Sequence, residues 1–174
     1  MTIQRYPKLQ ILLHWLMFFL IAVAAISIEV REAIPKGTDL RSELKSLHIF
    51  IGQLLLIFLF FRVITRLRFK QPLPESQIDW QVTLMKLVHV TLYVLMLAIP
   101  ITGILHMQAG AKEVSFLGHV LPEIISPDRE IKKIIKEIHE LFSNSLYLLV
   151  ALHVAATLWH HYVIRDGSLK RMLR

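Results

Sequence analysis

The chain has 174 residues, of which 55% are hydrophobic and 19% carry a charge. Its 20 Lys and Arg against 13 Asp and Glu give a formal net charge of +7, and it contains no cysteine. An average soluble domain is about 45–50% apolar and about 25% charged, so this composition favours a membrane protein with basic loops over a nucleic-acid-binding protein. The lack of cysteine excludes iron–sulfur clusters, covalently attached c-type haem, zinc ribbons and thiol catalysis.

Four apolar segments are long enough to cross a bilayer, whose core of roughly 30 Å takes about 20 helical residues. These segments are 9–28, 47–64, 87–105 and 138–164. Pro100 lies inside the third segment, where a membrane helix tolerates it, and we expect a kink there. The fourth continues upstream through a charged stretch to Asp128, a plausible helix start. The sequence therefore predicts an all-α, integral membrane four-helix bundle, with one domain over 1–174.

The distribution of Lys and Arg predicts the orientation of these helices. With a cytoplasmic N-terminus, eleven of the 20 basic residues fall inside and nine outside, and only three of the 13 acidic residues fall inside. We therefore expect both termini in the cytoplasm, an N-in/C-in topology. The outer loops are 29–46 and 106–137, and the inner loop, 65–86, leaves no room for a soluble catalytic domain.

The histidines are the residues of this sequence that indicate a functional site. An ionisable residue within a membrane span is a functional hypothesis by default, although a lone histidine is more often a polar helix–helix contact. Most of the nine lie in or at the edge of an apolar segment. They are His14, His48, His89, His106, His119, His139, His153, His160 and His161.

Two of these histidines lie on one side of the fourth helix at different depths. His139 and His153 are fourteen residues apart, so they differ by about 40° in direction and by roughly 21 Å in height. This spacing suits one imidazole for each of two stacked haems. Zinc would need ligands that converge on one point, which this pair does not provide.

The depth of each histidine in its membrane span indicates which residues can lie beside His139 and His153. His14 and His153 lie toward the cytoplasmic side of their spans and form a candidate inner pair. His48 lies near the outer end of its span, as His139 does, and these two form a candidate outer pair. Depth alone leaves rivals, because His89 and His106 on the third segment lie near the inner and outer levels, respectively. We interpret Gly52, one turn after His48, either as space for a porphyrin plane or as ordinary close packing.

The sequence resembles the bacterial cytochrome b561 family over essentially its whole length. The resemblance is carried by the opening run 5–11 before His14-Trp15, and by His153 followed by Ala155-Ala156 and His160-His161-Tyr162. It implies a four-helix membrane cytochrome with two b-type haems, bound axially by His14 with His153 and by His48 with His139. It also implies electron exchange with the quinone pool in the bacterial inner membrane, and superoxide oxidation by at least one member.

Three classes of function follow from this interpretation. We favour an electron-transfer oxidoreductase, a dihaem cytochrome between an outer-face donor and ubiquinone or another quinone. The alternative is the haem-bearing membrane anchor subunit of a larger hydrogenase- or formate-dehydrogenase-like complex, which a copurifying partner would reveal. The third class, a haem-free transporter or metal permease, would give a colourless protein. The expected partners are the lipid bilayer, a quinone and a small anionic or protein electron donor, with no nucleic acid.

Charged residues at the helix ends suggest two further sites. A quinone pocket is expected near His89, His160 and Arg165, because a histidine can relay protons and a cation can stabilise a reduced anion. At the outer end, a basic patch begins at Lys136 and continues back to Arg129, where it would attract an anionic donor such as superoxide. Basic residues at both ends are also candidates for binding haem propionates: Arg5, Lys8 and Arg165 inside, and Arg31, Arg41 and Lys45 outside.

Overall fold

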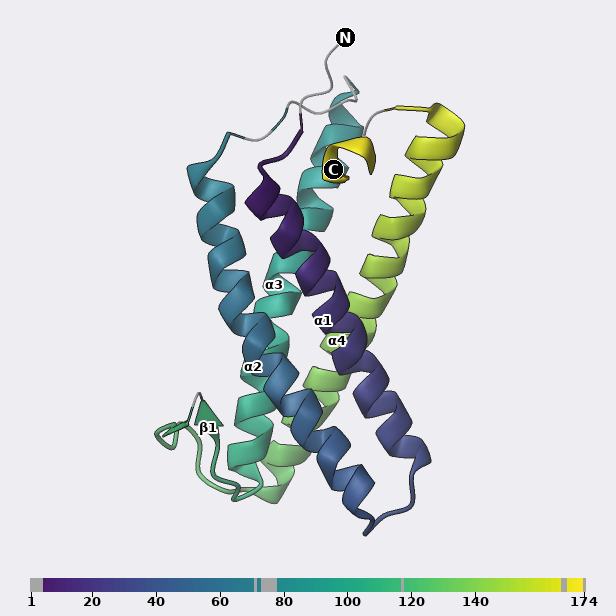
Figure 1. Cartoon of the computed structure of the whole chain (residues 1–174). Helices are drawn as coiled ribbons and strands as arrows, with labels where there is room; N and C mark the ends of the chain where they lie inside the picture. Colours follow the sequence, from purple (N-terminus) through teal and green to yellow (C-terminus); the bar gives the residue numbers. More distant parts are fainter. Residues whose placement is uncertain (1–4, 71, 73–77, 117, 167–168, 174) are drawn as a thin grey trace.

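Four long helices make up nearly the whole of the computed structural model, which describes residues 5–70, 72, 78–116, 118–166 and 169–173 (Figure 1). All four are long and apolar enough to cross a membrane. This confirms the predicted all-α membrane bundle. The helices are α1 (Lys8–Ala33), α2 (Asp39–Arg68), α3 (Asp79–Ala109) and α4 (Arg129–Trp159).

Each helix is longer than the apolar segment that predicted it, because polar residues at its ends continue the helix beyond the span. Asp39 and Asp79 stand in the first turns of α2 and α3, where a negative charge complements the helix dipole. At the start of α4, the carboxylate of Asp128 accepts a hydrogen bond from the backbone N–H of Ile131 at 2.8 Å. This N-cap confirms the predicted start. α3 runs through Pro100 without a break in the helix.

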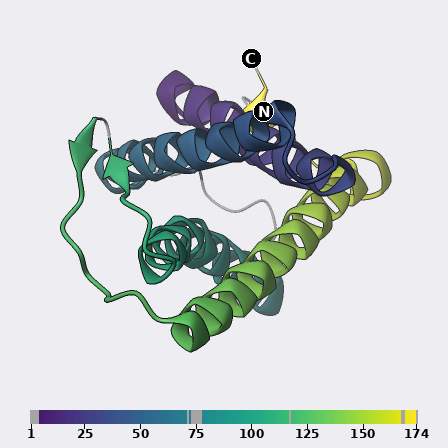
Figure 2. The ribbon, with the colours of Figure 1, turned by 90° about the horizontal axis from the view of Figure 1, so that it is seen from below.

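The helices pack as two hairpins that face each other. α1 packs along α2, α3 packs along α4, and the contact between α2 and α3 is smaller (Figure 2). On α1 the buried positions Leu13, Met17 and Leu20 follow helical spacing and so share one face. Large apolar side chains such as Phe19 and Leu148 are exposed on the outside, as expected of a surface that contacts lipid.

The connection between α3 and α4 contains a short hairpin, β1 (Ser115–Phe116) paired antiparallel with β2 (His119–Val120). Gly118 adopts φ +83° in its turn, a conformation that glycine adopts without steric cost. The amide of Gln53 donates a hydrogen bond to the Ser115 carbonyl at 2.6 Å and ties the hairpin to α2. The sequence predicted only a loop here, because two-residue strands leave no periodic signal.

Both termini lie at the opposite end of the bundle from this hairpin (Figure 1). We call the two ends the terminal end and the hairpin end. At the terminal end, α4 continues into a π-helical turn, η1 (His160–Ile164), and a short 3₁₀ helix, η2 (Leu169–Met172). The Met172 carbonyl accepts a hydrogen bond from the indole N–H of Trp15 at 2.9 Å. Residues 71 and 73–77 of the predicted inner loop lie outside the described residues.

Candidate functional site

The structure brings the outer pair together at the hairpin end of the bundle. The ring centroids of His48 on α2 and His139 on α4 are 6.3 Å apart, with an angle of 77° between the ring planes. The two helices belong to different hairpins of the bundle. The pair therefore spans the space between the hairpins and does not serve as a contact within one of them.

Backbone carbonyls fix the orientation of both outer rings. His48 Nδ1 lies 3.0 Å from the Ala24 carbonyl oxygen, and His139 Nδ1 lies 3.0 Å from that of Ile99. A carbonyl oxygen only accepts, so each Nδ1–H donates, and in the neutral ring the lone pair remains on Nε2. The Thr102 hydroxyl, also 3.0 Å from His139 Nδ1, adds a second polar contact. Both outer rings thus present a free Nε2, which is the tautomer that a metal requires.

The inner pair also comes together, but as part of a cluster of three histidines. The ring centroids of His14 on α1 and His153 on α4 are 6.3 Å apart, at 65° between planes. His89 on α3 approaches His153 more closely, with 5.4 Å between centroids. Its Nδ1 donates to the Met85 carbonyl one turn back at 2.6 Å, which leaves its Nε2 free as well.

An arginine inside the membrane contacts the inner cluster. A guanidinium nitrogen of Arg62 lies 3.0 Å from His14 Nδ1. Because arginine has only donors, His14 Nδ1 must accept, and the neutral ring then carries its proton on Nε2. The Arg62 Nε–H donates to the Tyr93 hydroxyl at 3.1 Å. From the sequence, Arg62 is one of the eleven basic residues expected on the inner side, although an arginine inside a span already signals a functional site.

Two glycines line the space around the outer pair. A Cβ added to Gly52 would meet no atom within 4 Å, so space is open one turn from His48. A Cβ added to Gly103 on α3 would lie 3.4 Å from Cε1 of His139. The position of Gly103 against a candidate ligand was missed from the sequence, because nothing in the spacing assigns a glycine of one helix to a histidine of another.

The terminal end contains a second polar contact that the sequence analysis missed. Nδ1 of His160, in η1, lies 2.6 Å from a carboxylate oxygen of Asp166. Arg165 between them is exposed and adopts the left-handed conformation, with φ 60°. Of the three residues predicted for a quinone site, His160 and Arg165 lie together at this end. His89 lies deeper, beside His153, which is about 10 Å along α4 from His160.

The sequence matches the profile of the family described as prokaryotic cytochrome b561 over residues 5–174. The chain belongs to this family. It is 35% identical over 170 residues to cytochrome b561 homolog 1 of Escherichia coli (strain K12), with 97% of each chain covered. It is 30% identical over 172 residues to the probable superoxide oxidase CybB of Yersinia pestis, covering 98% of this chain and 96% of the relative.

Cytochromes of the b561 family bind haem b, and the ring separation in both histidine pairs fits this group. An imidazole nitrogen binds a transition metal at about 2.0–2.1 Å, and the ring centroid lies roughly 1.1 Å behind that nitrogen. Two imidazoles on opposite sides of one iron therefore have centroids roughly 6.2–6.4 Å apart. The separation of 6.3 Å in each pair matches this value. The 5.4 Å between His89 and His153 is too short for it.

Three other histidines of this chain, His106, His119 and His161, lie outside the two histidine pairs. His106, the predicted rival at the outer level, has its Nδ1 3.3 Å from the Lys132 carbonyl oxygen, but among the described residues its ring is not paired with another histidine ring as those of His48 and His139 are. His161 packs edge-on against Tyr162. His119 is exposed on β2.

Two of the three candidates for propionate binding at the hairpin end, Arg31 and Arg41, have other partners. Arg41 donates to the Arg31 carbonyl at 2.6 Å and also reaches the Ile34 carbonyl and the Glu32 carboxylate. It thereby caps the carboxyl end of α1, where carbonyls have no helical partner. Arg31 pairs with Glu32.

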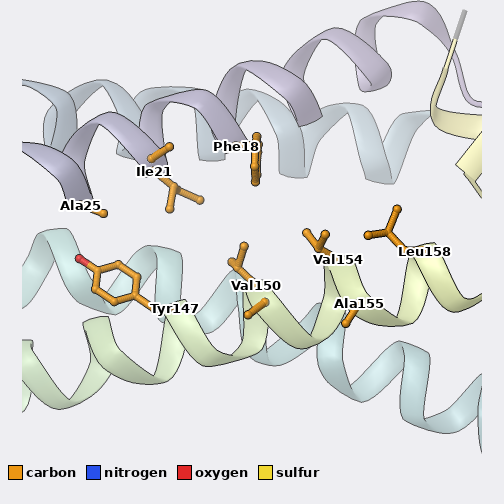
Figure 3. A pocket seen from close by; sticks show the side chains of 10 residues that line it. Phe18, Ile21, Ala25, Tyr147, Val150, Val154, Ala155 and Leu158 are labelled. Atoms are coloured by element: carbon orange, nitrogen blue, oxygen red, sulfur yellow. The ribbon is translucent and has the colours of Figure 1, made fainter.

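A groove of about 510 Å³ opens between α1 and α4, at depths that include the region between the two histidine pairs. Phe18 and Ile21 of α1 face Val150 and Val154 of α4 across it (Figure 3). Its lining is apolar except for the Tyr147 hydroxyl, so it offers no group that relays protons near neutral pH. The complete lining is Phe18, Ile21, Ala22, Ala25, Tyr147, Val150, Ala151, Val154, Ala155 and Leu158. This groove therefore suits proton-coupled chemistry less well than the histidine clusters do.

Proposed function

We propose that this protein holds two haem b groups and passes electrons from a donor at the hairpin end to a quinone at the terminal end. One observation carries the proposal: two histidine pairs, each with 6.3 Å between ring centroids, lie at two levels of a single bundle. Along α4 the two levels are fourteen residues apart, or roughly 21 Å. The ligands would be His48 and His139 for the outer haem, and His14 and His153 for the inner haem.

When bound, haem b supplies reversible one-electron chemistry. The residues of the chain hold and orient it. Two imidazole ligands on each haem would favour electron transfer over oxygen binding. The carbonyls of Ala24 and Ile99 keep the outer rings in the tautomer that binds a metal. At the inner level, ring separation favours His14 over His89 as the partner of His153, in agreement with the family resemblance.

The proposed direction of transfer includes an orientation in the bacterial inner membrane. We place the terminal end in the cytoplasm, because eleven of the 20 Lys and Arg belong to that end and membrane proteins retain basic segments inside. Arg165 and η2 then lie at the cytoplasmic surface. The hairpin end faces the periplasm, where an extracytoplasmic donor would arrive.

Superoxide is the proposed donor, and the similarity to the probable superoxide oxidase CybB of Yersinia pestis supports it. The basic patch contributes less than its sequence suggests. Lys136 forms an ion pair with Glu140 at 2.7 Å, and the side chain of Lys132 lies beside Gly110. Arg129 and Lys133 are exposed at the start of α4 and keep a positive charge in reach of an anion. We expect weak electrostatic steering of the donor.

The proposed acceptor is ubiquinone or a related quinone at the terminal end, beside His160 and Arg165. Reduction of a quinone to a quinol takes up two electrons and two protons, so the site needs a group that exchanges protons near neutral pH. Histidine is the side chain suited to this. His160 is half-buried and accessible from this end of the bundle, and Arg165 supplies a cation next to it.

Stopped-flow mixing of the purified protein with superoxide and ubiquinone tests the proposal. We expect rapid haem reduction followed by formation of one quinol for every two superoxide anions consumed. A variant with His48→Ala should lose the fast reduction by superoxide, whereas the control variant His119→Ala, on the exposed hairpin, should retain it. Slow haem reduction in the wild type would reject superoxide as the donor. Failure of ubiquinone to reoxidise dithionite-reduced protein would reject the acceptor.

A further inference from the structure

The contact between His160 and Asp166 is built by an unusual piece of backbone. α4 ends at Trp159, and the next five residues form the π-helical turn η1. Arg165 then adopts a left-handed conformation, which is uncommon for a residue with a side chain. The backbone N–H groups of both Arg165 and Asp166 are directed to the carbonyl oxygen of His160. Single π-helical turns occur frequently at functional sites.

This backbone folds the chain back so that the Asp166 carboxylate reaches the imidazole six residues earlier. The 2.6 Å between His160 Nδ1 and Asp166 Oδ2 is short for an N–H···O bond, as is typical when a charge takes part. The Asp166 side chain is only 14% exposed, whereas that of His160 is 31% exposed. The carboxylate is thus held beneath a ring that remains accessible.

The contact fixes which nitrogen of His160 is able to exchange protons with a ligand. A carboxylate accepts only, so Nδ1 keeps its hydrogen. Nε2, on the other side of the ring, therefore carries the exchangeable proton in the cation and the lone pair in the neutral form. The Asp166 carboxylate also fixes the orientation in which the ring presents Nε2.

We infer that Asp166 is a positioning residue for proton delivery to the quinone, acting through His160. This inference rests on the proposed quinone site. Nε2–H of the His160 cation donates its proton to an oxygen of the reduced quinone, an O–H bond forms, and neutral His160 remains on the Asp166 carboxylate. Water from the terminal end then reprotonates Nε2. Two such deliveries supply the two protons of the quinol, and the outer donor supplies the two electrons, one from each superoxide anion.

Three variants separate this role from a structural one. Asp166→Asn keeps an oxygen that accepts from Nδ1 but removes the charge, so the fold at the end of α4 should survive. Asp166→Glu keeps the charge, and His160→Gln removes the exchanging ring. Asp79→Asn is the matched control, because Asp79 is an exposed carboxylate in the first turn of α3 at the same end of the bundle. Haem spectra of all four report on intact folding.

Steady-state ubiquinone reduction is measured with superoxide as donor, together with the solvent deuterium isotope effect. For Asp166→Asn we expect kcat to fall about tenfold, KM for ubiquinone to stay within about twofold, and the isotope effect to rise. Asp166→Glu should recover most of the rate, and Asp79→Asn should match the wild type.

The outcomes distinguish this inference from the proposal on which it rests. If Asp166→Asn keeps the wild-type kcat while His160→Gln is slow, the inference is overturned and the quinone site at His160 stands. Unchanged kcat in His160→Gln overturns the site itself. An equal loss in Asp166→Asn and Asp166→Glu, with altered haem spectra, would assign Asp166 a structural role and also reject the inference.

Discussion

The outer and inner histidine pairs have the same ring separation and opposite surroundings. At the outer pair, both Nδ1 atoms donate to backbone carbonyls, and both Nε2 atoms are free. At the inner pair, Arg62 donates to Nδ1 of His14, and a third histidine lies 5.4 Å from His153. The outer pair is therefore preorganised for a metal. At the inner pair, His14 must lose the Arg62 contact or shift its proton before Nε2 binds iron.

This difference shows that matched ring separation does not by itself make two sites equivalent. Carbonyls of a helix are fixed by the backbone, so the outer rings are held by groups that do not move. A guanidinium on a flexible stem is held by its partners, here Tyr93 and His14. Its charge lies beside a candidate ligand in a membrane, where electrostatic effects are weakly screened. We therefore expect Arg62 to tune the redox properties of the inner site, whereas both outer rings are held by uncharged backbone carbonyls.

The largest expected effect comes from removing an outer ligand. His139→Ala should lower haem content by one group per chain, because its partner His48 alone leaves one axial position of the iron unfilled. The remaining low-spin spectrum should be that of the inner haem. Haem quantification and visible spectra of the variant measure this. Full haem content in His139→Ala would show that the outer pair is not a haem site.

The inner cluster allows a direct choice between two candidate partners of His153. His14→Ala should remove the inner haem, whereas His89→Ala should retain it, because only His14 stands at the ring separation that iron requires. Haem content and low-spin absorbance of the two variants decide the matter. Loss of the inner haem in His89→Ala, with retention in His14→Ala, would make His89 the ligand, in accordance with its free Nε2. Arg62 would then contact a histidine that does not bind haem.

A smaller effect is expected from the charge of Arg62. Replacing it by leucine removes a cation beside a ligand of the inner haem, so the reduced state loses stabilisation and the midpoint potential falls. A neighbouring charge at an effective dielectric constant of about 20 is worth roughly 1–2 kcal/mol, or about 40–90 mV. Redox titration of Arg62→Leu, with Arg62→Lys as the charge-preserving control, measures this. A shift confined to the outer haem would contradict the assignment of levels.

Gly103 offers a milder perturbation of the outer site. Its alanine variant places a Cβ 3.4 Å from Cε1 of His139, tight enough to displace the ring by a few tenths of an ångström. We expect a shift of the outer haem potential smaller than that in Arg62→Leu, with both haems retained. An inner shift in Gly103→Ala would be inconsistent with the proposed pairing.

The smallest effect is expected at the basic patch. Substituting Lys132, Lys133 and Lys136 together by glutamine should lower the rate of haem reduction by superoxide about two- to threefold at low ionic strength. The loss should fade as salt screens the charges over roughly 10 Å at 0.1 M. Stopped-flow rates in wild type and variant, compared at rising salt, measure it. Equal reduction rates in wild type and variant at all ionic strengths would show that these three lysines do not steer the donor.

Much of the fold and the grouping of histidines could be predicted from the sequence. Apolar length identified four spans, and depth along each span matched His14 with His153 and His48 with His139. These quantities depend on the rise per residue, which is nearly constant in a helix. Depth along the third span also placed His89 near the inner pair, and its ring lies 5.4 Å from that of His153.

The contacts that distinguish the two sites could not be predicted in this way. The rotation of α2 that directs Arg62 at His14 depends on packing between helices, and spacing within one helix does not determine it. The contact of Asp166 with His160 requires a π-helical turn and a left-handed Arg165, neither of which leaves a periodic pattern. The hairpin of β1 and β2 was missed for a similar reason, since its strands have two residues each.

Haem stoichiometry is the sharpest test of two bis-histidine haem sites in one chain. Extraction of haem from the purified wild-type protein, quantified as the pyridine complex against protein concentration from amino-acid analysis, gives the number of haems per chain. We expect two haem b groups per chain, both low-spin in the electron paramagnetic resonance spectrum of the oxidised protein. One haem per chain, or a high-spin signal from a haem with an open axial position, would contradict the assignment of two bis-histidine sites.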